Sequence, residues 1–269
     1  MKKITTTIRH YVRVYRMIMV LNWKKLLTYR ADLINSAIAH SIWATFTLFQ
    51  MLLLTSKASS VFGWSRNELL ILAGMYNIIY SFFYLFFSRG FNQFSNTIHF
   101  GRLDGILTKP IDSQFIMTCL YVSYTQIIRF VLGLGFLIYI LSYMHLVITP
   151  FLILKVVFLS LFSLTIIYSF WMIVMTLVIW FPKLSNLTDL LYQTNQVGKF
   201  PQEIYKGAST YLLFVLFPLT IIIVTPAKQL MQKIQLNDIL LLMLIASSLF
   251  IVSRLFWRYA LRFYTSVSG

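Results

Sequence analysis

Long stretches of apolar residues occupy most of this sequence, and a chain built in this way is typical of a membrane rather than of water. Hydrophobic residues make up 59% of the chain and charged residues only 11%, whereas a soluble domain carries about 25% charged residues. About 20 apolar residues in a helix cross the roughly 30 Å hydrocarbon core of a bilayer. The sequence therefore predicts an all-α, polytopic integral membrane protein with a single transmembrane domain over residues 1–269.

Six membrane spans are predicted along the chain. Five of the apolar runs are clear, and the remaining one is short and interrupted by Pro218 and Pro226, so we expect it to be broken or re-entrant. It is counted as a crossing because a chain with both termini on one side must cross an even number of times. The predicted spans are residues 33–54, 69–87, 114–143, 151–181, 204–231 and 240–257.

Basic residues gather beside these runs. The net charge is +16, and eight of the 23 Lys and Arg residues lie in the first thirty positions. Nucleic-acid binding is one reading of such a charge, but flanking basic residues are typical of cytoplasmic loops beside anionic lipid. The sequence thus predicts a multi-pass protein that contacts membrane lipids, has both termini in the cytoplasm and has no nucleic-acid partner.

Two polar segments stand outside the spans. Residues 4–30 combine a basic arc with apolar positions, which indicates a helix lying in the membrane interface or, alternatively, a solvated basic leader. Residues 88–112 form a polar, turn-prone connection that Pro110 ends. A helix within it would present Phe91, Phe94 and Ile98 on one face.

Catalytic motifs are missing from the sequence. There is no phosphate-binding loop, so we expect that ATP is not hydrolysed by this chain and that any ATP is bound by a separate subunit. The seven acidic residues lie near span ends or in loops, which argues against a proton relay at the bilayer centre. The lone Cys119 and four scattered histidines predict no metal site. We therefore expect no enzyme activity, no cofactor and no metal.

Charged and polar residues inside the predicted spans are candidates for a pathway. Arg129 falls well inside the third run, roughly 24 Å along a helix that starts near residue 113, and either packs between helices or lines a pathway. His40, in the first span, either lines a pathway or is a hydrogen-bonded packing residue. Lys155 can extend to the outer interface.

Three segments resemble a known family. They are GRLDGILTKPID at 101–112, KFPQEIYKGASTYLLFVLFPLTIIIVTPAKQL at 199–230 and the ending WRYALRFYTSVSG at 257–269. Together and in this order they resemble the permeases of the type 2 ATP-binding-cassette (ABC) superfamily in bacteria, and the resemblance covers essentially the whole chain. The polar stretch 183–200 is longer than expected for the family.

The resemblance implies a bacterial inner-membrane exporter subunit. Such permeases pair with an identical or related permease and bind two cytoplasmic ABC ATPase subunits. The resemblance maps a coupling helix onto residues 90–101, assisted by the interfacial helix 4–30, and re-entrant helices near the last span. The residues it assigns to ATPase coupling are Phe91, Phe94, His99, Gly101, Arg102, Asp104, Lys109 and Pro110. The candidates for a pathway or an interface are Arg129 and His40, from their position inside apolar runs, and Pro201, Pro218 and Pro226, which suit the re-entrant helices of the family.

Other functions remain open on the sequence. The connection 88–112 is an ordinary connector if it has no coupling role. The whole chain could instead be a membrane scaffold or immunity-type protein without energy coupling, or an ion-coupled carrier. The cargo stays undefined among drugs, peptides and lipids, because the aromatic and Met residues that would suit an amphipathic cargo are also those of packed and lipid-facing helices.

Overall fold

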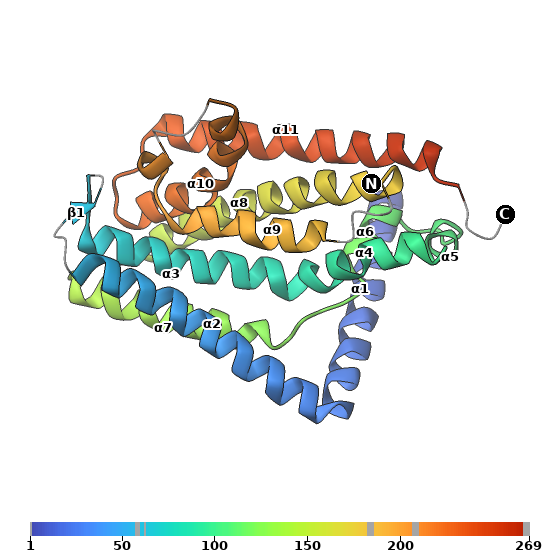
Figure 1. The fold of residues 1–269 in the computed structure, drawn as a ribbon, viewed down its shortest axis with the longest axis horizontal. Coiled ribbons are helices and arrows are strands. Elements are labelled where there is room, and N and C mark those ends of the chain that lie inside the picture. The colour runs from blue at the N-terminus through green and yellow to red at the C-terminus, as the bar shows by residue number, and fades with distance from the viewer. Residues whose placement is uncertain (1, 57–59, 62, 182–185, 206–209, 266–269) are drawn as a thin grey trace.

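Long helices lie side by side in the computed structural model, and one further helix crosses them (Figure 1). The structure describes residues 2–56, 60–61, 63–181, 186–205 and 210–265, and the side chains of these except at 2–8, 202 and 210–217. Residues 206–209 of the fifth predicted span and 266–269 of the family-like ending lie outside the described residues. The principal helices are α1 (Lys2–Thr28), α2 (Arg30–Ser56), α3 (Arg66–Phe83), α4 (Arg89–His99), α5 (Leu103–Leu107), α6 (Ser113–Cys119), α7 (Gln126–Tyr143), α8 (Pro150–Thr176), α9 (Leu187–Asn195), α10 (Thr210–Leu230) and α11 (Leu236–Ala260).

Five helical segments of the described chain are long and apolar enough to cross a membrane, which confirms the all-α membrane fold. They are Arg30–Ser56, Arg66–His99, Gln126–Tyr143, Pro150–Ile179 and Leu236–Phe263. One end of the bundle holds the short strands β1 (Ser60–Val61) and β2 (Trp64–Ser65), and we call it the hairpin end (Figure 1). The other end holds α5 and α6 and is called the helical end.

A single continuous rod forms the centre of the bundle. α3 continues through a π-helical turn, η1 (Tyr84–Ser88), into α4 without interruption, giving 34 residues from Arg66 to His99. At 1.5 Å per residue the rod is about 51 Å long, well beyond a hydrocarbon core of about 30 Å. Every residue from Leu69 to Asn77 is buried. The predicted second span and the predicted helix near 90–99 are therefore parts of one element.

The predicted third span, 114–143, is wrong as a single helix. α6 ends at Cys119 and α7 begins at Gln126, with non-helical backbone between them. Two long-range hydrogen bonds replace those the helix would have made: the Ser123 N–H donates to the Leu85 carbonyl of η1 (2.8 Å), and the Asn22 amide donates to the Leu120 carbonyl (3.0 Å). Irregular backbone survives inside a membrane protein when protein groups satisfy it in this way.

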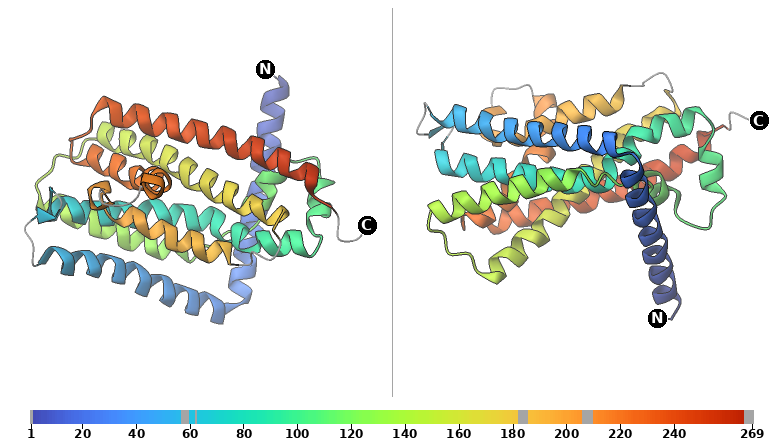
Figure 2. Two further views of the ribbon diagram at one scale, coloured as in Figure 1. Left: turned by 45° about the horizontal axis from the view of Figure 1, so that its top comes forward. Right: turned by 90° about the horizontal axis from the view of Figure 1, so that it is seen from below.

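Helix α1 crosses the helical end of the bundle and packs on this break (Figure 2). The Tyr124 hydroxyl donates to the Met19 carbonyl (2.7 Å), and the rings of Trp23 and Tyr124 lie 5.1 Å apart, edge to face. Further along α1, Tyr11 packs edge to face on Phe115 of α6. α1 therefore holds α6 and the break in place, and its crossing direction suits the predicted helix in the membrane interface.

The chain between α8 and α11 is irregular, as its composition predicts. After α8 and the 3₁₀ turn η2 (Leu177–Ile179), α9 is followed by two more 3₁₀ turns, η3 (Gln196–Lys199) and η4 (Gln202–Tyr205), and then by α10. The Trp64 indole donates to Glu203 (3.1 Å) and Lys233 pairs with Glu68 (2.6 Å), so both η4 and the turn after α10 reach the hairpin end. The chain thus passes from the helical end to the hairpin end through α9, η3 and η4. The turn after α10 lies at the hairpin end as well, so the predicted span 204–231 is not one straight crossing helix.

Gly90 marks the closest approach between α4 and α6. A Cβ atom at Gly90 would lie 2.2 Å from the Thr118 carbonyl oxygen and 2.9 Å from its Cα, and both are backbone atoms. Such a contact cannot be relieved by turning a side chain, so the helices would have to move apart. Gly90 is therefore the residue that allows the rod to lie against α6.

We predict that Gly90→Ala lowers the free energy of unfolding by about 1–3 kcal/mol, the usual cost of overpacking. Gly135→Ala is the matched control, because a Cβ at Gly135 on α7 meets nothing within 4 Å. Thermal unfolding of the purified variants in one detergent measures both. Equal stability of the two variants would contradict the close contact.

Candidate functional site

The coupling residues predicted on α4 fall into a buried group and an exposed group. Phe91 and Phe94 are fully buried, with Phe91 5.4 Å from the Trp171 ring of α8 and Phe94 5.6 Å from the Trp257 ring of α11. The predicted apolar face of α4 therefore points into the bundle. In this conformation Phe91 and Phe94 anchor α4 and do not reach an outside partner.

The exposed group lies where α4 ends. Gly101 has a positive φ of 65°, a conformation that favours glycine, and it turns the chain out of the helix. Next to it Phe100 is 62% exposed, and the Arg102 guanidinium carbon lies 5.6 Å from the centre of its ring. We call the exposed residues His99, Phe100, Arg102, Leu107, Lys109 and Pro110 the tip. Phe100 and Leu107 were not singled out from the sequence, although exposed apolar residues in a polar segment are typical of contact surfaces.

Asp104 belongs to the helical end but not to the exposed tip. It is half-buried and lies near Tyr264, which follows α11. Burial, followed by the nearby Asp104 carboxylate, raises the pKa of the Tyr264 hydroxyl. Asp104 therefore links the segment after α4 to the end of α11.

Asp112 joins three helices at the helical end, a role that was not predicted from the sequence. The Arg254 guanidinium of α11 donates to both Asp112 carboxylate oxygens (2.8 and 2.6 Å). The same carboxylate accepts from the Phe115 N–H and so caps α6, while the Asp112 N–H donates to the Tyr11 hydroxyl of α1. A two-pronged arginine–carboxylate pair is among the stronger polar contacts in proteins. α1, α6 and α11 are thereby tied at one point.

We predict that Asp112→Asn lowers the free energy of unfolding by about 1–3 kcal/mol, between the values for exposed and buried ion pairs. Asp32→Asn is the matched control, because Asp32 pairs with Arg89 at 3.6 Å in an exposed position, and we expect a loss of about 0–1 kcal/mol there. Thermal unfolding at neutral pH measures both.

The Asp112 pair also sets a pH dependence. Burial opposes ionisation of Asp112, but the bonds from Arg254 and the Phe115 N–H outweigh it and hold its pKa below the ordinary 3.8. The stabilisation is therefore complete above pH 3.8 and is lost as pH falls through the lowered value. We predict that the difference in unfolding free energy between the wild type and Asp112→Asn shrinks as the pH falls below 3.8, measured by thermal unfolding across this pH range. A constant difference between the two at every pH would contradict this assignment.

A second cluster of polar residues lies inside the bundle around Arg129. The sequence placed Arg129 far along a helix that starts near residue 113, but in the structure it is the fourth residue of α7. It still lies at membrane depth. Counting about 1.5 Å per residue, it lies roughly 21 Å from the end of α7 at Tyr143, and its partner Asn77 lies roughly 16 Å from the start of α3. The Arg129 side chain is buried, and its Nε donates to the Asn77 amide oxygen (3.0 Å).

Aromatic rings surround the Arg129 guanidinium. Tyr76 and Tyr80 of α3 and Tyr84, the first residue of η1, follow one face of the rod at four-residue spacing. The guanidinium carbon lies 5.4 Å from the ring centres of both Tyr76 and Tyr84. Such cation–π contacts stabilise a cation that water does not reach. Arg129 Nη2 and the Tyr80 hydroxyl are buried without a hydrogen-bond partner among the described residues.

Lys199 of η3 lies beside this tyrosine face, which the sequence did not suggest. Its Nζ lies 5.7 Å from the Tyr76 ring centre and 5.9 Å from that of Trp43 on α2, and the side chain is buried. The turn is held there by Asn195, whose amide donates to the Tyr84 hydroxyl (3.1 Å) and accepts from the Trp171 indole (3.3 Å). Two cations, Arg129 and Lys199, therefore share one region inside the bundle. We call it the cation cluster.

The electrostatic balance of the cation cluster is unusual. A charged side chain at the centre of a bilayer costs at least about 2.5–3.5 kcal/mol unless it is compensated. The ion pairs found in the described part of the chain are Arg89–Asp32, Lys228–Asp238, Lys233–Glu68 and Arg254–Asp112, and none includes Arg129 or Lys199. Rings and one amide are their partners instead.

The remaining predicted pathway residues are dispersed. His40 of α2 bonds the Ser36 carbonyl of its own helix through Nδ1, which is the packing arrangement. Pro201 is buried immediately before η4, where its carbonyl accepts from the Ile204 N–H. Pro218 and Pro226 both lie within α10. His40 feels the charge of Arg129. Pro201 follows Lys199 by two residues, and the carbonyl of Leu219, next to Pro218, lies 3.4 Å from a Cβ built at Gly198.

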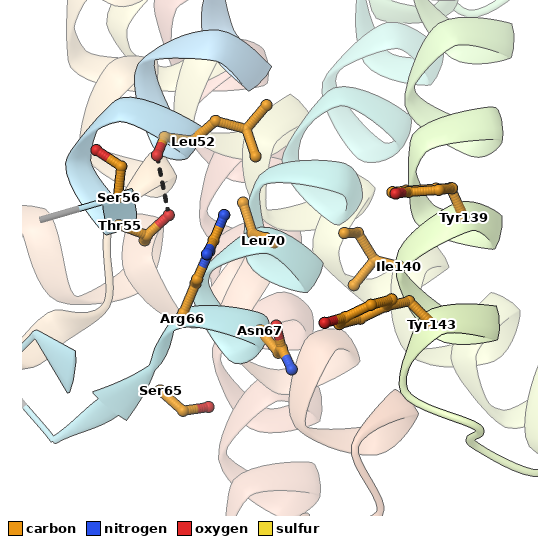
Figure 3. Close-up of a pocket in the computed structure, with 10 residues that line it drawn as sticks. All are labelled: Leu52, Thr55, Ser56, Ser65, Arg66, Asn67, Leu70, Tyr139, Ile140 and Tyr143. Atoms are coloured by element: carbon orange, nitrogen blue, oxygen red, sulfur yellow. Dashed lines mark hydrogen bonds between the residues drawn. The ribbon is translucent and has the colours of Figure 1, made fainter. Parts of the chain in front are cut away.

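An open pocket of about 750 Å³ lies at the hairpin end, between α2, α3 and α7 (Figure 3). In the close-up Arg66 points between α2 and α3, and Tyr143 of α7 lies toward Asn67. Its position at the bundle end and its mixed lining suit the headgroup level of a bilayer, where aromatic and basic side chains are common. The lining residues are Leu52, Thr55, Ser56, Ser65, Arg66, Asn67, Leu70, Tyr139, Ile140 and Tyr143.

The fold and the arrangement of charge define a polytopic helical membrane protein with an irregular segment and buried cations inside its bundle. Residues 41–268 match the family described as ABC-2 family transporter protein, and the chain belongs to this family. It is the membrane-spanning permease component of an ABC transporter, a class that works with ABC ATPase subunits. No curated protein and no solved structure matches the chain.

Proposed function

We propose that this chain is half of the membrane pathway of an ATP-driven exporter in the bacterial inner membrane. It pairs with a second copy or a related permease, and ATP is bound and hydrolysed by separate cytoplasmic subunits. The observation that carries the proposal is the rod Arg66–His99, which runs without a break from the hairpin end to the exposed tip. A push on the tip would reach the centre of the bundle through one helix.

Charge supports placing the helical end in the cytoplasm. The basic residues of α1, of the segment 89–109 and of the end of α11 all lie toward this end. At the hairpin end Lys228 and Lys233 are paired with acids. Arg66 also lies at the hairpin end, but the excess of basic residues lies at the helical end. Such an excess marks the cytoplasmic side of bacterial membranes, so we place both described ends of the chain there.

The orientation can be tested with single cysteines, because the one native Cys119 is buried. In a Cys119→Ser background we predict that Thr108→Cys, near the tip, reacts with a membrane-impermeant thiol reagent only after cells are opened. Ser60→Cys, on β1, should react in intact cells. Both positions are exposed. The reverse pattern would place the tip outside the cell and end the exporter proposal.

Coupling through the tip gives a second prediction. Arg102→Glu combined with Phe100→Ala should lower transport-coupled ATPase activity about tenfold or more, since truncating central interface residues costs upward of 1–2 kcal/mol. Membrane insertion and thermal stability should change little, because both residues are exposed. The assay uses the permease co-purified with its ATPase subunits.

Arg66→Glu is the control for this experiment, because it makes the same charge change at the hairpin end. Normal coupling in the tip variant would indicate that the segment 88–112 is an ordinary connector. Loss of coupling in both variants would point to a general charge effect and would also contradict a specific role for the tip.

A further inference from the structure

We propose that the cation cluster binds a cargo through an oxyanion, either a carboxylate or a phosphate. The proposal rests on the proposed function only in naming the ligand a cargo. Arg129 and Lys199 are both more than nine-tenths buried, and neither forms an ion pair with a carboxylate in the described part of the chain. An oxyanion would supply the missing opposite charge.

Unused hydrogen-bond donors point to the same ligand chemistry. Within the part of the chain that the structure describes, Arg129 Nη2 has no hydrogen-bond partner, and neither has the Tyr80 hydroxyl of the tyrosine face. The Tyr80 hydroxyl approaches Gly198, next to Lys199: a Cβ built at Gly198 would lie 3.2 Å from it. Arginine, lysine and hydroxyl donors converging on one place are the usual means of binding a carboxylate or phosphate.

The first half of α2 is less buried in the bundle than its second half. The buried residues of α2 are Ala44, Thr47, Leu48, Met51 and Thr55, all toward the hairpin end, and no buried residue lies in its first half. Figure 1 and the left view of Figure 2 both show this first half diverging from α3. Trp43, beside Lys199, is 49% exposed and immediately precedes Ala44, the first buried residue of α2. The proposed entry for an anionic head is therefore beside this exposed half of α2, next to Trp43.

The test measures binding to the permease reconstituted in phosphatidylcholine nanodiscs, without any ATPase. The probes are dodecyl phosphate, dodecanoate and inorganic phosphate, with dodecyl maltoside as a neutral head on the same chain. We expect saturable binding of the two amphipathic anions and none of the maltoside. Arg129→Gln and Lys199→Gln should each weaken binding tenfold or more.

Lys155→Gln is the matched control. Lys155 is also a cation in an apolar helix, but it is exposed on α8, where its Nζ lies 4.3 Å from the Phe151 ring centre. Its replacement should leave binding within twofold. Arg129→Lys, which keeps the charge, should retain most of the affinity, and Lys199→Gln decides the outcome if Arg129→Gln does not fold.

The outcomes distinguish the source of the oxyanion. Displacement of dodecyl phosphate by inorganic phosphate would support a site for the head group alone. Displacement only by phosphatidylglycerol in the nanodisc would support the site with an anionic lipid as its ligand. Equal binding by wild type and both Gln variants, or no anion binding by wild type, would overturn the proposal. Anion binding without any ATP-coupled transport would instead leave the site standing and refute the exporter.

Discussion

Every backbone polar group at membrane depth must find a partner within the protein, and this requirement governs the centre of the bundle. Two departures from regular helix lie side by side there: the π-helical turn Tyr84–Ser88 in the rod and the break between α6 and α7. They are joined by the bond from the Ser123 N–H to the Leu85 carbonyl. A π-helical turn changes the bonding of a helix locally and is frequent at functional sites. Each irregularity thus helps to satisfy the other, and neither would be stable alone in lipid.

The charged residues at the two ends of the bundle differ from those in its middle in the partners they have. Carboxylates at the two ends pair with basic residues and tie helices together, as Asp112 does with Arg254 and Glu68 does with Lys233. In the middle, Arg129 and Lys199 have aromatic and amide neighbours in place of carboxylates. Ion pairs therefore fix the ends, while the interior keeps a net positive charge.

The sequence predicted the helices from the length and composition of their apolar runs, and these are strong local signals. It predicted the break near residue 120 wrongly, because Leu120–Thr125 contains no Gly or Pro and is as apolar as a helix interior. The bonds that break the helix come from Asn22 and Leu85, far away in the chain. A local pattern carries no information about such partners.

In the candidate site, too, the sequence predicted the features that depend on local pattern and missed those that depend on distant partners. The apolar face of α4 was predicted correctly as a face, but periodicity alone cannot tell whether a face meets its own chain or another one, and here Phe91 and Phe94 meet Trp171 and Trp257. Arg129 was recognised because an arginine within an apolar run is conspicuous. Lys199 was not recognised, because it lies in a polar stretch whose return into the bundle depends on the bond between Asn195 and the distant Tyr84.

The central rod also has the geometry of a lever. The rod is held closely at two neighbouring points. At Gly90 it lies against α6, and at Leu85 it accepts a hydrogen bond from Ser123 of the break. From Leu85 the rod extends roughly 28 Å toward Arg66 and roughly 21 Å toward His99, at about 1.5 Å per residue. If the rod tilts about that point as a stiff body, its far end swings in the opposite direction and about 1.3 times as far as the end that is displaced. A small inward displacement on one side of the membrane would then appear, enlarged, on the other.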